Sequence, residues 1–468
     1  MDSFATSSFA SLRLGLIGIL LGAGSTALAQ RPAISPLSAN DVSWLFPPPA
    51  RAADFDKLIA VRDLTTGKPS AAKRDPIWPD AVFKQFLAIA ASPAAEAGGK
   101  QIGLPAEAQT IDAWFVAGIR IDAGAPGLSN EVVGQFGRSP EIRLIVQPVT
   151  RNPDGTPKVL DIAAHLIFNF VAGQNDPAQT GCLQRPKPDL VAFKAIVAEL
   201  AALRTRLSRG LLGNRVATSG VPLGVHPGLA NATTAKNVRK EMKSFLERHI
   251  SGQRLDAMAI AALPAGAPAP WIFLSMTKVP PGVVPALPNG GFVPVHGPTL
   301  DGQQFAQMLE PIGTVPPVVP APATNNLNPI TCRNAALPAG LPVAERSGSS
   351  TTELFASPPP AAKAKQVLDL IADPAKSHFF NTDCISCHTE TRRAMDLLPL
   401  NDIKVVSGID PAVLPGGDWN VRNFGWSRSE EPTKPDGKTT FSAATATRRA
   451  ASETKAVVDY INSHGLTH

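Results

Sequence analysis

Ile142-Arg143-Leu144-Ile145-Val146 predicts a β-strand, because aliphatic and β-branched residues are typical of strands. A turn follows at Asn152-Pro153-Asp154-Gly155, where proline and glycine favour a reversal of the chain. A second apolar run then extends from Val159 to Phe170. Strand, turn and strand in this order predict a β-hairpin.

Further strands and helices are predicted on both sides of this hairpin. Strand-like runs extend over Trp114 to Ile121, Leu255 to Ala262 and Trp271 to Val279. Helical spacing of apolar residues, with N-cap residues in front, occurs at Asp80 to Ile89, Leu190 to Leu207 and Val238 to His249. We therefore expect residues 30–279 to form an α+β domain, an antiparallel sheet with helices on one face.

The N-terminus predicts export from the cytoplasm. Arg13 precedes a short apolar stretch from Leu14 to Ala23, and Ala27-Leu28-Ala29 is a small-x-small cleavage site. Residues 1–29 are thus expected to be a Sec-type signal peptide, and the mature chain to be periplasmic or otherwise exported. No later run reaches about 18 apolar residues, so no stable membrane span is expected.

Composition sets limits on the rest of the chain. The 468 residues include 46 prolines, and residues 280–350 are so rich in them that we expect a linker or an extended arm there. The net charge of +6 is spread without a basic block, which argues against nucleic-acid binding. The adjacent pairs Arg392-Arg393 and Arg448-Arg449 are interpreted as solvated helix faces.

The chemistry of the chain is concentrated in Cys384-Ile385-Ser386-Cys387-His388. Thiols at positions i and i+3 can both form thioethers with one edge of a haem, and the following imidazole can bind the iron. A thioredoxin-like dithiol would require a βαβ setting, and a zinc site would require a second pair of ligands nearby. The motif therefore predicts one covalently attached haem c, held by Cys384, Cys387 and His388.

Residues 351–468 resemble a small cytochrome c domain. The resemblance rests on the pentapeptide, on Phe379-Phe380 before it, and on Val457-Val458-Asp459-Tyr460-Ile461 in a final helix predicted from Thr445 to Ser463. A further helix is predicted over Ala361 to Ala372. The resemblance covers about a quarter of the chain and implies an all-α, haem-binding C-terminal domain.

The sixth ligand of the iron is not evident from the sequence. Met395 is the only methionine after His388, on the same segment, and is interpreted as a packing residue. His464 is a possible distal ligand, or else a solvated residue at a helix end. The other histidines at 165, 226 and 296 lack partners at metal spacing and are interpreted as structural. Possible contacts to the haem propionates or pocket are Arg392, Arg393, Trp419 and Trp426.

The two remaining cysteines, Cys182 and Cys332, lie in loop-like settings. In an exported protein they could form a disulfide, or they could be two buried free thiols.

Together these features favour an exported single-haem c-type cytochrome that transfers electrons to a redox partner protein. If the distal side of the iron is open, the alternative is a haem enzyme or a small-ligand sensor. A third possibility is a binding or structural protein that the haem only stabilises. The sequence assigns no role to residues 30–340.

Overall fold

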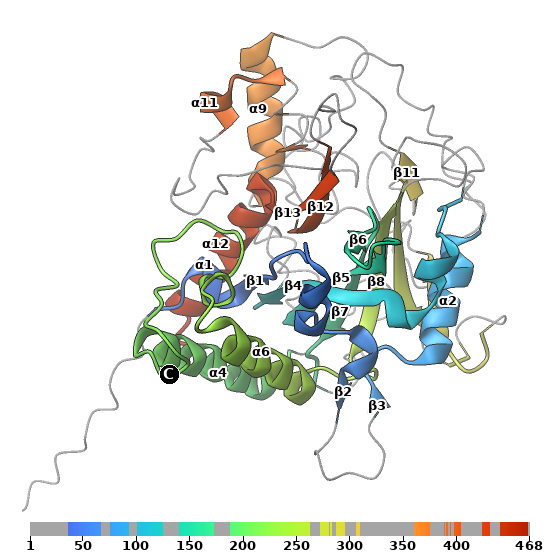
Figure 1. Ribbon diagram of the computed structural model, residues 1–468, viewed down its shortest axis with the longest axis horizontal. Helices are drawn as coiled ribbons and strands as arrows, with labels where there is room; N and C mark the ends of the chain where they lie inside the picture. Colours follow the sequence, from blue (N-terminus) through green and yellow to red (C-terminus); the bar gives the residue numbers. More distant parts are fainter. Residues whose placement is uncertain are drawn as a thin grey trace, which may run out of the picture. The chain divides into compact units, whose positions relative to one another are not determined.

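A large antiparallel sheet forms the centre of the computed structural model (Figure 1). In the described part of the chain it has nine strands, in the order β1-β4-β5-β7-β8-β9-β10, with β6 paired to β5 and β11 paired to β9. These strands are β1 Ser43–Leu45, β4 Trp114–Asp122, β5 Glu141–Arg151, β6 Pro157–Val159, β7 Ala163–Asn169, β8 Leu255–Ala262, β9 Ile272–Val279, β10 Gly291–Pro294 and β11 Ala306–Met308. Two separate pairs are β2 Thr65–Thr66 with β3 Asp75–Pro76, and β12 Phe424–Glu430 with β13 Thr440–Ala446.

The structure describes residues 36–66, 75–92, 101–124, 140–172, 188–262, 272–279, 281–282, 287–294, 306–308, 360–374, 388, 390–391, 394, 397–403, 424–430 and 440–466. Their helices are α1 Ala39–Val42, α2 Asp80–Ala90, α4 Leu190–Ser208, α5 Pro227–Ala230, α6 Ala235–His249, α9 Ala361–Ala372, α11 Leu400–Ile403 and α12 Arg448–Ser463. Short 3-10 helices span Ala52–Lys57, Val61–Asp63, Ala106–Gln109 and Ile111–Ala113. No helix of these residues is long and apolar enough to cross a membrane.

The predicted hairpin is present, with one refinement. The apolar run after the turn divides into β6 and β7, and both strands pair with β5. Gly155 in the turn has a φ of 82°, a left-handed conformation that glycine adopts without steric strain. The expected antiparallel sheet is thereby confirmed, as are the strand pair β8–β9 and the helices α2, α4 and α6.

One face of this sheet is apolar. Alternate residues of the central strands point to it and are fully or almost fully buried: Ile119, Ile121, Ile142, Leu144, Leu166 and Phe168. Phe245 of α6 packs edge-on against Trp44 of β1 on this face, with ring centroids 5.0 Å apart. Helices α4 and α6 run side by side in Figure 1, and both contribute to the same core. This arrangement agrees with the expected helix layer.

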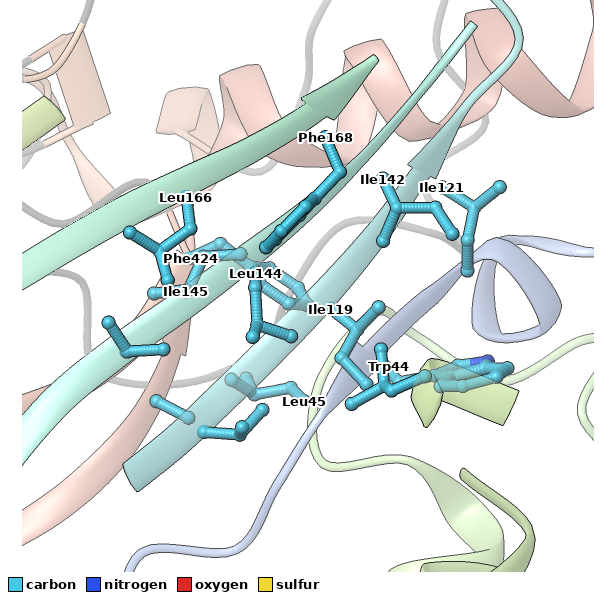
Figure 2. Close-up of a cluster of buried hydrophobic side chains, with 14 of the residues drawn as sticks. Trp44, Leu45, Ile119, Ile121, Ile142, Leu144, Ile145, Leu166, Phe168 and Phe424 are labelled. Atoms are coloured by element: carbon cyan, nitrogen blue, oxygen red, sulfur yellow. The ribbon is translucent and has the colours of Figure 1, made fainter. Parts of the chain in front are cut away.

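The prediction of an all-α cytochrome c-like domain over residues 351–468 is wrong. Residues 424–446 contain the antiparallel hairpin β12–β13, although α9 and the final helix were predicted correctly. Phe424 and Trp426 of β12, and Val457 and Ile461 of α12, belong to the same hydrophobic cluster as the sheet. Figure 2 shows Phe424 among the side chains of the central strands. The hairpin and α12 therefore contribute to the core of the sheet, while Ala364 and Leu368 of α9 pack with Ala394 and Leu398 in a second, small cluster.

Candidate functional site

The second face of the sheet carries the polar and charged residues. Residues paired directly across antiparallel strands point to the same side. Arg120 pairs with Arg143, Asp122 with Glu141, and Ile145 with His165. All of these side chains, together with Ser43 opposite Arg120 and Gln147 two residues after Ile145, therefore lie on one face. This polar face is formed by β1, β4, β5 and β7, the strands that also build the apolar core.

The C-terminal segment covers part of this polar face. Glu453 of α12 forms an ion pair with Arg120 at 2.7 Å, and both side chains are about nine-tenths buried. One residue further on, the hydroxyl of Thr454 lies 2.9 Å from that of Ser43. The first turn of α12 starts at Thr447, whose side chain accepts a hydrogen bond from the Ala450 backbone at 3.2 Å. Helix α12 is thus fixed to β1 and β4 by polar contacts.

Strand β12 is fixed to the same face by Gln147. The backbone N–H of Trp426 donates to Gln147 Oε1 at 2.6 Å, and Gln147 Nε2 donates to the Trp426 carbonyl at 2.9 Å. The indole N–H of Trp426 donates to the Phe46 carbonyl at 2.8 Å. Because an indole has a single donor, Trp426 has none left for a haem propionate. Its position in the core makes it a docking residue of β12.

Arg448 and Arg449 in the first turn of α12 are buried, so the expectation of a solvated pair is wrong. Arg449 Nε pairs with Glu453 at 2.7 Å, and its Nη1 donates to the Ile371 carbonyl at 2.9 Å. Arg448 pairs with Asp369 of α9. Cations at a helix N-terminus oppose the helix dipole, so such a pair requires acidic partners. Two adjacent arginines at the start of a predicted helix were therefore a sequence signal for acidic partners.

Electrostatic interactions across this layer shift several pKa values. Burial favours the neutral form of Glu453, yet Arg449, Arg120 and Arg143 outweigh it and hold the pKa of Glu453 far below its usual range. Burial raises the pKa of Asp122 to about 7, and the neighbouring charge of Glu141 adds to that rise. The layer therefore contains an ionised carboxylate on α12 and a carboxyl on β4 that protonates near neutrality.

His388, the last residue of the pentapeptide 384–388, lies against this layer. Its ring centroid is 6.4 Å from that of His165 on β7, and the two ring planes are inclined by 68°. Burial lowers the pKa of His388 to about 4; Glu453 opposes this shift, and Arg143 and Arg449 add to it. The imidazole of His388 is neutral at pH 7, which is the form that binds a metal ion.

His165 lies beside His388 although no local sequence pattern connects the two. It was interpreted as structural because no metal-binding partner lies near it in the chain; His388 is more than 200 residues away. One local signal was available. In the alternating strand β7, His165 occupies the face opposite to the buried Leu166 and Phe168, on the polar side of the sheet.

His464 lies at a different place from His388. It caps the end of α12, is exposed, and its ring stacks on Tyr460 with centroids 4.0 Å apart. Glu453 influences His388 electrostatically. Because Glu453 precedes His464 by eleven residues on α12, these two residues are separated by about 16 Å along the helix axis.

The other residues predicted for the site lie outside the described part of the chain. These are Cys384, Cys387, Arg392, Arg393, Met395 and Trp419, and the same holds for Cys182, Cys332 and the predicted signal peptide at 1–29. Within the described residues, no group of three or more His, Cys, Asp or Glu side chains is arranged to hold a metal ion.

No family model matches this chain. Searches of curated proteins and of solved structures likewise found nothing similar. Its function must therefore be argued from the motif and from the geometry around His388.

Proposed function

We propose that this protein is an exported single-haem c-type cytochrome that transfers electrons, with the haem attached to Cys384 and Cys387 and bound at the iron by His388. The observation that carries the proposal is the pentapeptide 384–388 together with the setting of its histidine. A neutral imidazole is the form that would bind the haem iron. The signal-like N-terminus adds support, because it would bring the chain to a compartment outside the cytoplasm.

The residues around His388 fit a haem in two respects. First, the layer offers buried cationic donors for the propionate carboxylates. Arg120 Nε and Arg448 Nη1 are buried and have no hydrogen-bond partner among the described residues. Second, Arg143 and Arg449 interact electrostatically with His388 itself, so positive charge lies close to the proposed site. These arginines would hold and neutralise the anionic edge of the group.

When bound, the haem would supply a one-electron iron couple. The protein's own contribution is to position and shield that couple. His388 provides a neutral nitrogen ligand, and the ion pairs of Glu453 with Arg120 and Arg449 hold the covering helix against the sheet. A fixed, partly desolvated environment changes little when the oxidation state changes, which favours electron transfer to a partner protein.

Covalent attachment is tested by extraction. The full chain is produced with its signal sequence in a host that matures c-type haem, and the purified protein is treated with acidified acetone. Haem should stay with the polypeptide, because thioether bonds survive this treatment where ligation does not. The double variant Cys384→Ala/Cys387→Ala should lose it, whereas Cys182→Ala/Cys332→Ala serves as a matched control and should retain it. Retention of haem by the first double variant would overturn the assignment.

A further inference from the structure

We propose that His165 is the sixth ligand of the haem iron, binding from the side opposite His388. The inference rests on the proposed function and goes beyond it, because the ligand comes from the central sheet and not from the segment that carries the haem motif. The paired imidazoles of His165 and His388 are the observation that carries it.

The separation of the two rings suits a shared metal ion. A metal–imidazole bond is about 2 Å long and each ring centre lies about 1 Å behind its nitrogen, so two axial imidazoles have centres about 6 Å apart. The observed separation is 6.4 Å. Two imidazoles bound to one iron on opposite sides share a single nitrogen–iron–nitrogen axis. Each ring can take any rotation about that axis, so the observed angle of 68° between the ring planes is compatible with such binding.

The sheet holds His165 rigidly. Its strand lies in the middle of the sheet, with His165 directly between Ile145 of β5 and Ala259 of β8. Ladders on both sides fix the backbone at His165, so the side chain starts from a defined position on the sheet. A ligand on such a strand is pre-organised for the metal.

Alanines of β8 lie on one side of His165, and Ile145 of β5 lies on the other. Ala257, Ala259 and Ala261 of β8 point to the same side, because they pair with Ile167, His165 and Ala163 of β7. Methyl side chains rise little above the sheet, so this area can accept a flat macrocycle beside the imidazole. The polar face thus combines an imidazole, a flat apolar surface and, on β5, the charge of Arg143.

Two other arrangements are less well supported. Edge-to-face packing of two rings without a metal also gives separations of about 4.5 to 7 Å. That alternative predicts no coordination change when His165 is replaced. His464, the other distal candidate, stacks on Tyr460 at the exposed end of α12, about 16 Å along the helix from Glu453.

Closed coordination by two imidazoles favours the electron carrier over the sensor or haem enzyme. No site would be open for a small ligand, and the midpoint potential would lie below that of a histidine–methionine couple.

The test compares His165→Ala and His165→Met with the wild type, using His464→Ala as a matched histidine control. Ferric wild type should give the low-spin EPR spectrum of iron with two nitrogen ligands. His165→Ala should become high-spin, recover the low-spin signal when imidazole is added, and bind carbon monoxide at least tenfold faster in the reduced state. His165→Met should raise the midpoint potential. His464→Ala should match the wild type in every measurement.

The outcomes separate this inference from the proposed function. Wild-type protein that carries no covalent haem contradicts the proposed function itself. Covalent haem in a high-spin wild type, or an unchanged low-spin spectrum in His165→Ala, leaves the proposed function standing and overturns His165 as ligand. If His165→Ala does not fold, the wild-type spectrum and the potential of His165→Met still decide, because an unshifted potential would contradict ligation.

Discussion

The two faces of the central sheet are built from the same strands but are covered in different ways. The apolar face packs against α4 and α6, whose sequences lie between those of β7 and β8, and its contacts are those of side chains such as Trp44 and Phe245. The polar face is covered by β12 and α12, and its ion pair between Arg120 and Glu453 joins residues 333 positions apart. One face is therefore packed by helices close in sequence, whereas the other combines apolar residues such as Phe424 and Trp426 with buried ion pairs and the surroundings of His388.

The largest effect should come from the apolar face. Phe168→Ala removes a fully buried ring, and such a change costs about 4 kcal/mol through lost burial and the cavity left behind. Urea unfolding followed by circular dichroism measures the loss. Val191→Ala on α4, where the side chain is 84 % exposed, is the control and should stay within about 0.5 kcal/mol of the wild type. A loss below 1 kcal/mol for Phe168→Ala would show that this face is not the main core.

On the polar face, Glu453→Gln should destabilise by about 3 kcal/mol, because it leaves the buried Arg120 and Arg449 without their ionised partner. Asp459→Ala removes an exposed ion pair with Lys455 from the same helix and should change stability by less than about 1 kcal/mol. Unfolding in urea compares the two. Equal, small effects would contradict the buried network.

The contact between β12 and the sheet can be tested at Gly118. A Cβ atom there would lie 2.7 Å from Phe424 Cε1, too close for a buried ring to accommodate freely. Gly118→Ala should therefore cost about 2 kcal/mol by overpacking. Gly224→Ala, where nothing lies within 4 Å, is the matched control and should be neutral. Thermal unfolding distinguishes them, and a neutral Gly118→Ala would mean that Phe424 does not pack on β4.

The last prediction concerns how the stability of the folded protein depends on pH. The pKa of Asp122 is raised to about 7 in the folded state, so the folded protein binds more protons than the unfolded chain between about pH 4 and pH 7. Stability contributed by this group is therefore complete below about pH 4 and decreases as the pH rises to 7. Asp122→Asn keeps the acceptor for the Gly124 N–H but does not titrate, so its stability relative to the wild type should rise between pH 4 and pH 8. An identical pH dependence in both proteins would contradict the shift.

The sequence predicted the parts of the fold that depend on local patterns. The run around Ile142 to Val146, the turn at Asn152-Pro153-Asp154-Gly155 and the capped helix after Asp189 each contain their own signal, since turn residues and caps act on neighbouring backbone. The C-terminal hairpin was missed. Its strands are stabilised by packing Phe424 and Trp426 onto a sheet that lies some 280 residues earlier, and no local pattern records that.

The candidate site also contains residues with a local sequence signal and residues without one. The prediction for residues 384–388 rests on spacing within five residues, which a sequence alone displays. Arg120, the distant partner of Glu453, and His165, whose ring lies near His388, come from other elements, so only tertiary packing brings these groups together. A single histidine in a strand has no feature that distinguishes a ligand from a structural residue.

The intact mass of the denatured, purified protein shows whether one haem is covalently bound through residues 384–388. Denaturation removes any group held only by packing or by His388, so only covalent attachment contributes to the mass. We expect a single species that exceeds the mature polypeptide by one haem, and a bare polypeptide for Cys384→Ala/Cys387→Ala. A wild-type mass equal to that of the polypeptide alone, from cells that mature other c-type haem proteins, would contradict the account.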